Sequence, residues 1–204
     1  MIKFIADKRL KISKTILSFI IIILCISVNK FERDSFLYDF LESIGFIFVL
    51  IGIFGRIWSS LYIEGSKTKK LITQGSYSIM RNPLYFFSFL ILLGFCFTIK
   101  SIFVTIILLL VWVLVYRNTI AVEEKNLLDI HKNEYMRYRS NTPRILPKLS
   151  LYKKSEKMST LNINIRGIER VLVESLGFLL VFEIIKTIEH LHFNDILPIL
   201  FYLN

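Results

Sequence analysis

Four stretches of the chain contain no charged residue and have lengths typical of apolar helix cores. They are residues 16–28, 44–55, 84–99 and 101–116, and Lys100 alone separates the last two. A bilayer core takes about 20 mostly apolar residues per helix, and fewer when flanking lysines reach the headgroups. A water-soluble protein would need a polar face on each segment, and these segments have none. The pattern predicts an all-α, polytopic membrane bundle and excludes a soluble enzyme, a secreted disulfide scaffold and a disordered tail.

The uncharged runs predict four spans, of which the last two form a hairpin. We expect the first two spans at about residues 12–28 and 40–63. Pro83 begins the third span, a favoured position because its missing N–H would be unpaired there anyway. The third and fourth spans form a tight helical hairpin over residues 84–120, and the fourth helix continues beyond it into the cytosol.

A fifth apolar stretch, residues 171–191, differs from the others because it carries charges. Its charged residues include Glu183 and Lys186, which can pair at i,i+3 spacing. We interpret the stretch as a fifth transmembrane helix, with an interfacial helix as the alternative. The preceding residues 131–166 are basic and broken by prolines, which favours loops and short helices on the membrane surface.

The second span contains two charged residues, Glu42 and Arg56. They are fourteen residues apart, or about 21 Å along a helix, so they cannot pair with each other. We expect Glu42 to be solvated near the outer end. Arg56 lies deeper and faces protein or a polar cavity, unless it reaches back to the cytoplasmic interface.

The basic residues of the chain are unevenly distributed. The chain has 26 Lys and Arg against 16 Asp and Glu, a net charge of +10. Residues 64–82 and 117–170 hold most of the basic residues outside the N-terminal segment, and the positive-inside rule places all three segments in the cytoplasm. We expect them to contact anionic headgroups of the lipid bilayer. No nucleic-acid partner is expected, because no binding motif accompanies the charge.

Several familiar chemical motifs are missing from the sequence. It contains neither G-x-G-x-x-G nor a Walker sequence, so nucleotide binding by those loops is unsupported. The three histidines lack the spacing of a metal site, and no metal is expected. Cys25 and Cys96 lie in apolar stretches, which is typical of inert core thiols.

Two polar clusters fall at the cytoplasmic ends of the hairpin helices. The first contains Leu71, Ile72, Gly75, Tyr77, Arg81, Asn82, Pro83, Leu84 and Tyr85, and the second contains Glu123, Glu124, Tyr135, Tyr138, Pro143 and Pro147. Because a hairpin places the start of one helix beside the end of the next, we expect the clusters to meet. Their charges, hydroxyls and helix-start N–H groups suit a zwitterionic ligand at the membrane edge. The alternative is an interfacial belt of arginines and tyrosines with solvated glutamates.

The order of these residues resembles the signature of the isoprenylcysteine carboxyl methyltransferase family and of related small membrane methyltransferases, including phospholipid N-methyltransferases. The family pattern is L-V-x-x-G-x-Y-x-x-x-R-H-P-x-Y, then a helical hairpin, E-E-x-x-L and Y-x-x-Y. The resemblance covers about residues 45–149. These would form the methyltransferase-like core of one membrane-embedded domain, residues 1–204, with a helical extension at 150–204.

The resemblance implies that S-adenosylmethionine is held at the cytoplasmic mouth and that a lipophilic small molecule or lipid acceptor enters from the bilayer. It assigns cofactor contacts to Lys69, Lys70, Leu71, Ile72, Tyr77, Asn82, Pro83, Leu84, Tyr85 and Glu123. The candidate catalytic residues are Arg117, Glu124 and Arg81. A carboxylate acceptor needs only alignment and exclusion of water, whereas an amine acceptor must lose a proton, for which Glu124 is the candidate base.

Three positions depart from the family pattern. Asn82 replaces the usual His, Thr119 stands where the family has its substrate arginine, with Arg117 nearby, and Lys132 stands at about the place of a glycine. Asn keeps a donor and an acceptor but cannot titrate. Three hypotheses therefore remain: a carboxyl O-methyltransferase, a phospholipid amine N-methyltransferase, and a non-catalytic membrane protein that keeps the fold. The sequence identifies neither the acceptor nor the oligomeric state.

Overall fold

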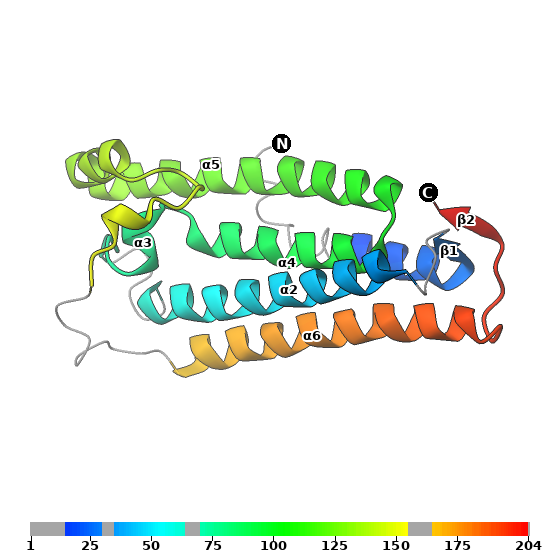
Figure 1. Ribbon diagram of the computed structural model, residues 1–204. Coiled ribbons are helices and arrows are strands. Elements are labelled where there is room, and N and C mark those ends of the chain that lie inside the picture. Colours follow the sequence, from blue (N-terminus) through cyan, green and yellow to red (C-terminus); the bar gives the residue numbers. More distant parts are fainter. Residues whose placement is uncertain (1–14, 30–34, 64–69, 155–164, 204) are drawn as a thin grey trace.

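Four long helices run side by side along most of the molecule (Figure 1). The computed structural model describes residues 15–29, 35–63, 70–154 and 165–203. The long helices are α2 (Phe36–Ile63), α4 (Pro83–Ile99), α5 (Ile102–Asn141) and α6 (Ile165–Phe193). Shorter elements are the helix Thr15–Ile26, α3 (Ser76–Ile79) and the 3₁₀ turn η1 (Leu149–Leu151). The predicted helical fold is confirmed, with one small addition.

That addition is a pair of short parallel strands, β1 (Ser27–Asn29) and β2 (Phe201–Leu203). The sequence did not predict them, because three-residue segments are too short to show strand alternation. The buried side chain of His192 lies beside them, with its Nε2 2.9 Å from the carbonyl oxygen of Leu24. These contacts fasten the segment that follows α6 to the helix Thr15–Ile26.

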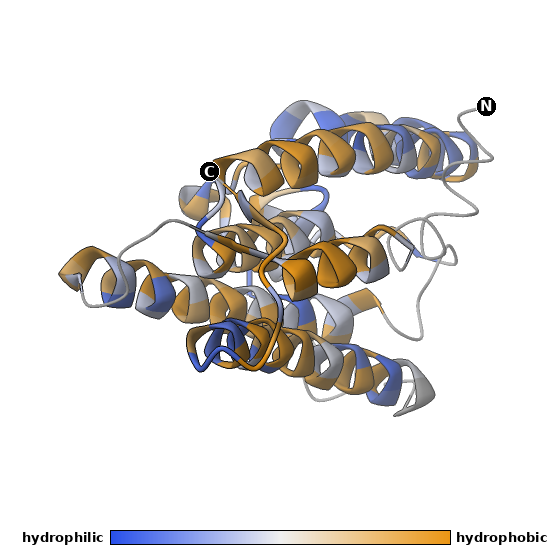
Figure 2. Ribbon diagram, turned by 90° about the vertical axis from the view of Figure 1, so that its right-hand side faces the viewer, coloured by the Kyte–Doolittle hydropathy of each residue, from blue (hydrophilic) through white to orange (hydrophobic). Residues whose placement is uncertain are grey.

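The helices α2 and α5 are long and apolar enough to cross a membrane, whereas α4 and Thr15–Ile26 are shorter apolar helices. Large apolar side chains are exposed along the first half of α5, among them Phe103, Leu110 and Leu114. Figure 2 shows α5 changing from hydrophobic to hydrophilic along its length. An apolar surface of this kind suits lipid, and it covers only the first half of α5, because the second half of the helix is polar. Residues 12–14 of the expected first span lie outside the described residues.

The predicted hairpin is formed by α4 and α5. Helix α4 begins at Pro83, as expected, and ends at Ile99, and the next residue, Lys100, adopts the left-handed conformation with φ 54°. The hydroxyl of Ser101 then accepts a hydrogen bond from the N–H of Val104, which starts α5. With 40 residues, α5 extends well past its 17-residue partner. The expectation of loops and short helices from residue 131 was wrong as far as Asn141, because Tyr135 and Tyr138 give this part of α5 a buried face.

Two glycines allow the backbones of α2 and α4 to touch. A Cβ atom built on Gly45 would lie 2.8 Å from the carbonyl oxygen of Gly94, and one built on Gly94 would lie 2.6 Å from the carbonyl oxygen of Gly45. Small residues at such crossings let membrane helices approach closely enough for backbone van der Waals contact. This crossing fixes α4, and therefore the start of the hairpin, against α2.

Ion pairs hold α6 along α2 in an antiparallel arrangement. Arg56 Nη2 lies 2.6 Å from Glu174 Oε2, and Lys186 Nζ lies 2.5 Å from Glu42 Oε1. Arg56 therefore faces protein, as one of the two alternatives predicted. Two other expectations were wrong: Glu42 is not simply solvated, and Lys186 forms its ion pair with Glu42 rather than with Glu183. Charges inside an apolar bundle are stabilised by a partner from a neighbouring helix.

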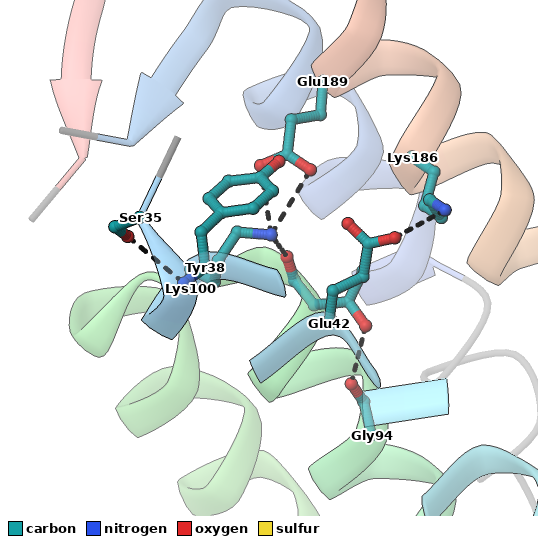
Figure 3. Close-up of polar contacts among 8 residues, drawn as sticks. Ser35, Tyr38, Glu42, Gly94, Lys100, Lys186 and Glu189 are labelled. Carbon is teal, nitrogen blue, oxygen red and sulfur yellow. Dashed lines mark hydrogen bonds and ion pairs between the residues drawn. The ribbon is translucent and has the colours of Figure 1, made fainter. Parts of the chain in front are cut away.

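A second set of polar contacts lies where α4 turns into α5 (Figure 3). The Lys100 ammonium is fully buried and lies 3.2 Å from Glu189 Oε1. It also donates to the carbonyl oxygen of Thr98 and lies 3.8 Å from the centre of the Tyr38 ring. The hairpin turn is thus attached to both α6 and α2.

Candidate functional site

The opposite end of the hairpin brings the two predicted polar clusters together. The hydroxyl of Tyr85, on the first turn of α4, donates a hydrogen bond of 2.5 Å to Glu123 Oε1 on α5. Asn82, which immediately precedes α4, donates from Nδ2 to Glu124 Oε1 at 2.9 Å. The predicted meeting of the clusters is confirmed, across 38 and 42 residues of sequence.

Glu124 is the centre of this arrangement. Arg144 Nε lies 3.2 Å from its Oε2, and Arg81 Nη2 lies 3.7 Å from its Oε1. The side chains of Glu124 and Arg81 are 13% and 9% exposed, whereas that of Arg144 is 43% exposed. Two guanidinium groups therefore face one carboxylate, one from inside the protein and one from its surface.

Residues 142–153, which we call the strap, cross over the site after α5 ends. The backbone N–H of Arg81 donates to the carbonyl of Pro143, and that of Lys148 donates to the carbonyl of Ile79. The carbonyl of Arg144 accepts a second hydrogen bond from Asn82 Nδ2, at 3.0 Å. The strap thereby holds Arg144 beside Glu124. Sequence reasoning noted the prolines of this segment but missed Arg144, since no local pattern shows where a loop crosses the surface.

Two buried tyrosines near the end of α5, Tyr135 and Tyr138, pack against the segment that precedes α4. The Tyr138 hydroxyl donates to the backbone carbonyl of Tyr77 at 2.6 Å, and Leu71 packs against Tyr135 and Tyr138. Burial raises the pKa of both phenols above the usual value, and for Tyr135 the nearby Glu124 carboxylate raises it further. Both hydroxyls therefore stay protonated at physiological pH. The end of α5 reaches this position after Lys132, whose φ of 42° interrupts the helix.

A row of aromatic rings leads from the site along the hairpin. The ring of Tyr85 packs edge to face against Tyr116 with centroids 5.4 Å apart. Trp112 follows at 5.3 Å from Tyr116, and Phe89 at 4.7 Å from Trp112. The rings connect the polar end of the hairpin with its apolar part.

The remaining predicted residues are less closely gathered. Lys69 lies outside the described residues and Lys70 is exposed, while Ile72 and Leu84 are half-buried and Pro83 is buried. Arg117 is exposed and makes no ion pair within the described part of the chain. Thr119 is buried and its hydroxyl donates to the carbonyl of Val115. The structure thus gathers Arg81, Asn82, Tyr85, Glu123 and Glu124, together with Arg144.

Known proteins similar to this chain share most of its length. It is 28% identical to the cobalt-zinc-cadmium resistance protein CzcN of Cupriavidus metallidurans over 189 residues. This alignment covers 93% of this chain and 85% of CzcN. It is also 30% identical to the nickel-cobalt-cadmium resistance protein NccN of Alcaligenes xylosoxydans xylosoxydans over 186 residues. This alignment covers 91% of this chain and 85% of NccN. No solved structure matches the chain.

The phospholipid methyltransferase family matches residues 41–134, a range that contains α4, the hairpin and both glutamates. This match coincides with most of the region in which the sequence resembles small membrane methyltransferases. The protein is therefore a membrane protein of the small methyltransferase-like family that includes the phospholipid methyltransferases and the CzcN and NccN proteins.

Proposed function

We propose that this protein is a membrane methyltransferase that uses S-adenosylmethionine and transfers a methyl group to a lipophilic acceptor at the cytoplasmic face. The observation that carries the proposal is the contact of the two motif halves across the hairpin, Tyr85 with Glu123 and Asn82 with Glu124. Groups far apart in sequence are brought together at one polar end of a bundle whose helices are mostly apolar. A site of this kind can hold a polar donor while an apolar acceptor arrives from the bilayer.

The residues present fit the chemistry of the cofactor. Arg81 is buried, and its Nε and Nη1 have no hydrogen-bond partner in the structure. Helix α4 begins without a side-chain cap, so its first N–H groups add positive potential. A carboxylate matches both features, an ammonium or ribose hydroxyl matches Glu123, and an adenine matches the ring faces of Tyr85 and Tyr116.

The bound cofactor would supply an electrophilic methyl group on a sulfonium. The protein's own contribution is to orient the donor and acceptor and to keep out water, which can lower a barrier substantially because the reactants are already aligned. Glu123 would hold the donor from α5 and Tyr85 would keep the Glu123 carboxylate in place. Glu124 is held by Asn82, Arg81 and Arg144, so it fixes the relative positions of the two motif halves.

The acceptor is proposed by class only. Methylation of a lipophilic carboxylate needs no general base. This suits the site because Glu124 already holds Arg81, Arg144 and Asn82, and a proton transferred to it would weaken these contacts. A phospholipid amine is the second candidate, favoured by the family that matches residues 41–134. The pH dependence of the rate separates them: a carboxylate acceptor gives a flat profile above about pH 5, whereas the rate with an amine falls as the amine or its base is protonated.

A non-catalytic membrane protein is the candidate from another class. The replacements Asn82 and Thr119 motivate it, and the relatives' names refer to metal resistance rather than to methyl transfer. Among the described residues, no group of three or more His, Cys, Asp or Glu side chains is arranged to hold a metal ion. These residues therefore give no support to direct metal binding by such a cluster.

The test is methyl transfer in membranes that contain the full-length protein. Membranes are incubated with S-adenosylmethionine carrying a labelled methyl group, and the lipid extract is analysed by mass spectrometry. We expect one or more lipids to gain a labelled methyl group, and Glu123→Ala to abolish the gain while Lys125→Ala, an exposed neighbour, does not. A lipid extract that stays unlabelled with the wild-type protein, while a known methyltransferase labels it, would contradict the proposal.

A further inference from the structure

Arg81 combines a buried charge with unused hydrogen-bonding capacity. Its side chain is 9% exposed, and two of its three guanidinium nitrogens, Nε and Nη1, are buried without a partner. A buried group of this kind normally has every N–H satisfied, because an unmade hydrogen bond to a charged donor is costly. Arg81 is therefore a buried cation with two nitrogens, Nε and Nη1, whose N–H groups have no hydrogen-bond acceptor.

The groups nearest to the Arg81 guanidinium are the Glu124 carboxylate and the Tyr135 hydroxyl, whose pKa the guanidinium lowers, but neither accepts a hydrogen bond of ordinary geometry from Nε or Nη1. The third nitrogen, Nη2, faces Glu124, but at 3.7 Å, and the same carboxylate also receives Asn82 and Arg144. The guanidinium of Arg81 therefore keeps N–H donors at Nε and Nη1 that a negatively charged ligand could use.

The start of α4 lies immediately beside Arg81 in the chain and adds to the same preference. Asn82, at the N-cap position, gives its side chain to Glu124 and Arg144 rather than to the helix, and Pro83 occupies the first turn. This leaves N–H groups of a 17-residue helix uncapped by a side chain, next to the Arg81 guanidinium, of which only Nη2 faces a partner. Helix starts of this kind favour anions.

We propose that Arg81 binds the carboxylate of the methyl donor's amino-acid moiety, together with the first turn of α4. This rests on the proposed function and refines it. Arg81 becomes a ligand-binding residue rather than a residue that acts on the acceptor. The planar guanidinium can offer two parallel N–H donors to a carboxylate, which a lysine cannot.

The test compares two donors that differ only in the carboxylate, S-adenosylmethionine and decarboxylated S-adenosylmethionine. Binding of each to the full-length protein in detergent is measured by titration calorimetry, for the wild type, Arg81→Gln and Arg81→Lys. Arg137→Gln serves as the matched control, because Arg137 is an exposed arginine near the end of α5.

We expect the wild type and Arg137→Gln to bind the decarboxylated donor at least about 30-fold more weakly than S-adenosylmethionine, the lower end of the range for losing one partner of a buried charge pair. Arg81→Gln should lose most of that factor for S-adenosylmethionine and keep only the small discrimination that the first turn of α4 provides. Arg81→Lys should recover only part of the discrimination.

Equal binding of the two donors by the wild type would overturn the inference, whether or not the Arg81 variants fold. Full discrimination retained by Arg81→Gln would overturn it as well. If instead the proposed methyltransferase function is wrong, the wild type will bind neither donor at millimolar concentration, a result that differs from equal binding of both.

Discussion

The crossing of α2 and α4 can be tested with a single methyl group. In Gly94→Ala the added Cβ would lie 2.6 Å from the carbonyl oxygen of Gly45 and 2.6 Å from Val49 Cγ2, where ordinary contact begins at 3.4 Å. The backbone oxygen cannot rotate away, so α2 must move by about 0.8 Å, the difference between these two distances. Overpacking of this kind costs about 1–3 kcal/mol.

Gly177→Ala is the matched control for this substitution. Gly177 also lies in a long helix, α6, but a Cβ built there meets nothing within 4 Å. Alanine is favoured over glycine in a helix by about 0.5–1 kcal/mol, so this variant should be as stable as the wild type or slightly more stable.

The assay is thermal unfolding of the full-length protein in detergent. For a chain of this size about 1 kcal/mol corresponds to about 2–4 °C, so Gly94→Ala should unfold roughly 2–12 °C below the wild type. Gly177→Ala should unfold at or above the wild-type temperature. If the two variants unfold together, α2 and α4 do not approach through their glycines, and the placement of α4 must be reconsidered.

Three further predictions concern the ion pairs, the kink and the buried phenols. Glu174→Ala removes the partner of Arg56 and should cost about 1–2 kcal/mol, less than a fully buried pair because Glu174 is 38% exposed; replacing both residues by leucine should recover stability, and the same unfolding assay measures it. Lys132→Gly should stabilise the protein by about 1 kcal/mol and Lys132→Ala should not, because only glycine relieves a φ of 42°; equal unfolding temperatures would contradict this. The raised pKa of Tyr138 means that its contribution to stability is present below about pH 10, the unfolded value, and is lost as the pH rises further. Tyr138→Phe should therefore flatten the loss of stability in a pH series, and an unchanged slope would contradict that origin.

The sequence was sufficient to predict the elements that position the site. Pro83 marks the start of α4 because proline suits the first helical turn, and the single charge at Lys100 marks the hairpin. Once the hairpin is placed, the contact of Tyr85 with Glu123 follows from helix geometry, since both lie at the same end. These predictions depend on local chain properties, which a single sequence records well.

What the sequence did not predict depends on contacts between distant segments. Arg144 joins the site because the strap returns across α3 and the start of α4, a path fixed by backbone hydrogen bonds such as that from Lys148 to Ile79. Lys186 pairs with Glu42 because α6 packs along α2, although a local partner was available in Glu183. Lys132 has a positive φ at about the place where the family pattern has a glycine, but the lysine itself gives no sign of that conformation.

The measurement closest to the central claim is the titration of S-adenosylmethionine into the detergent-solubilised full-length protein. We expect micromolar binding that Glu123→Ala abolishes, that Tyr85→Phe weakens because the 2.5 Å hydrogen bond is lost, and that Lys125→Ala leaves unchanged. Absence of binding at millimolar cofactor, or binding indifferent to Glu123, would contradict a donor site between the two halves of the hairpin.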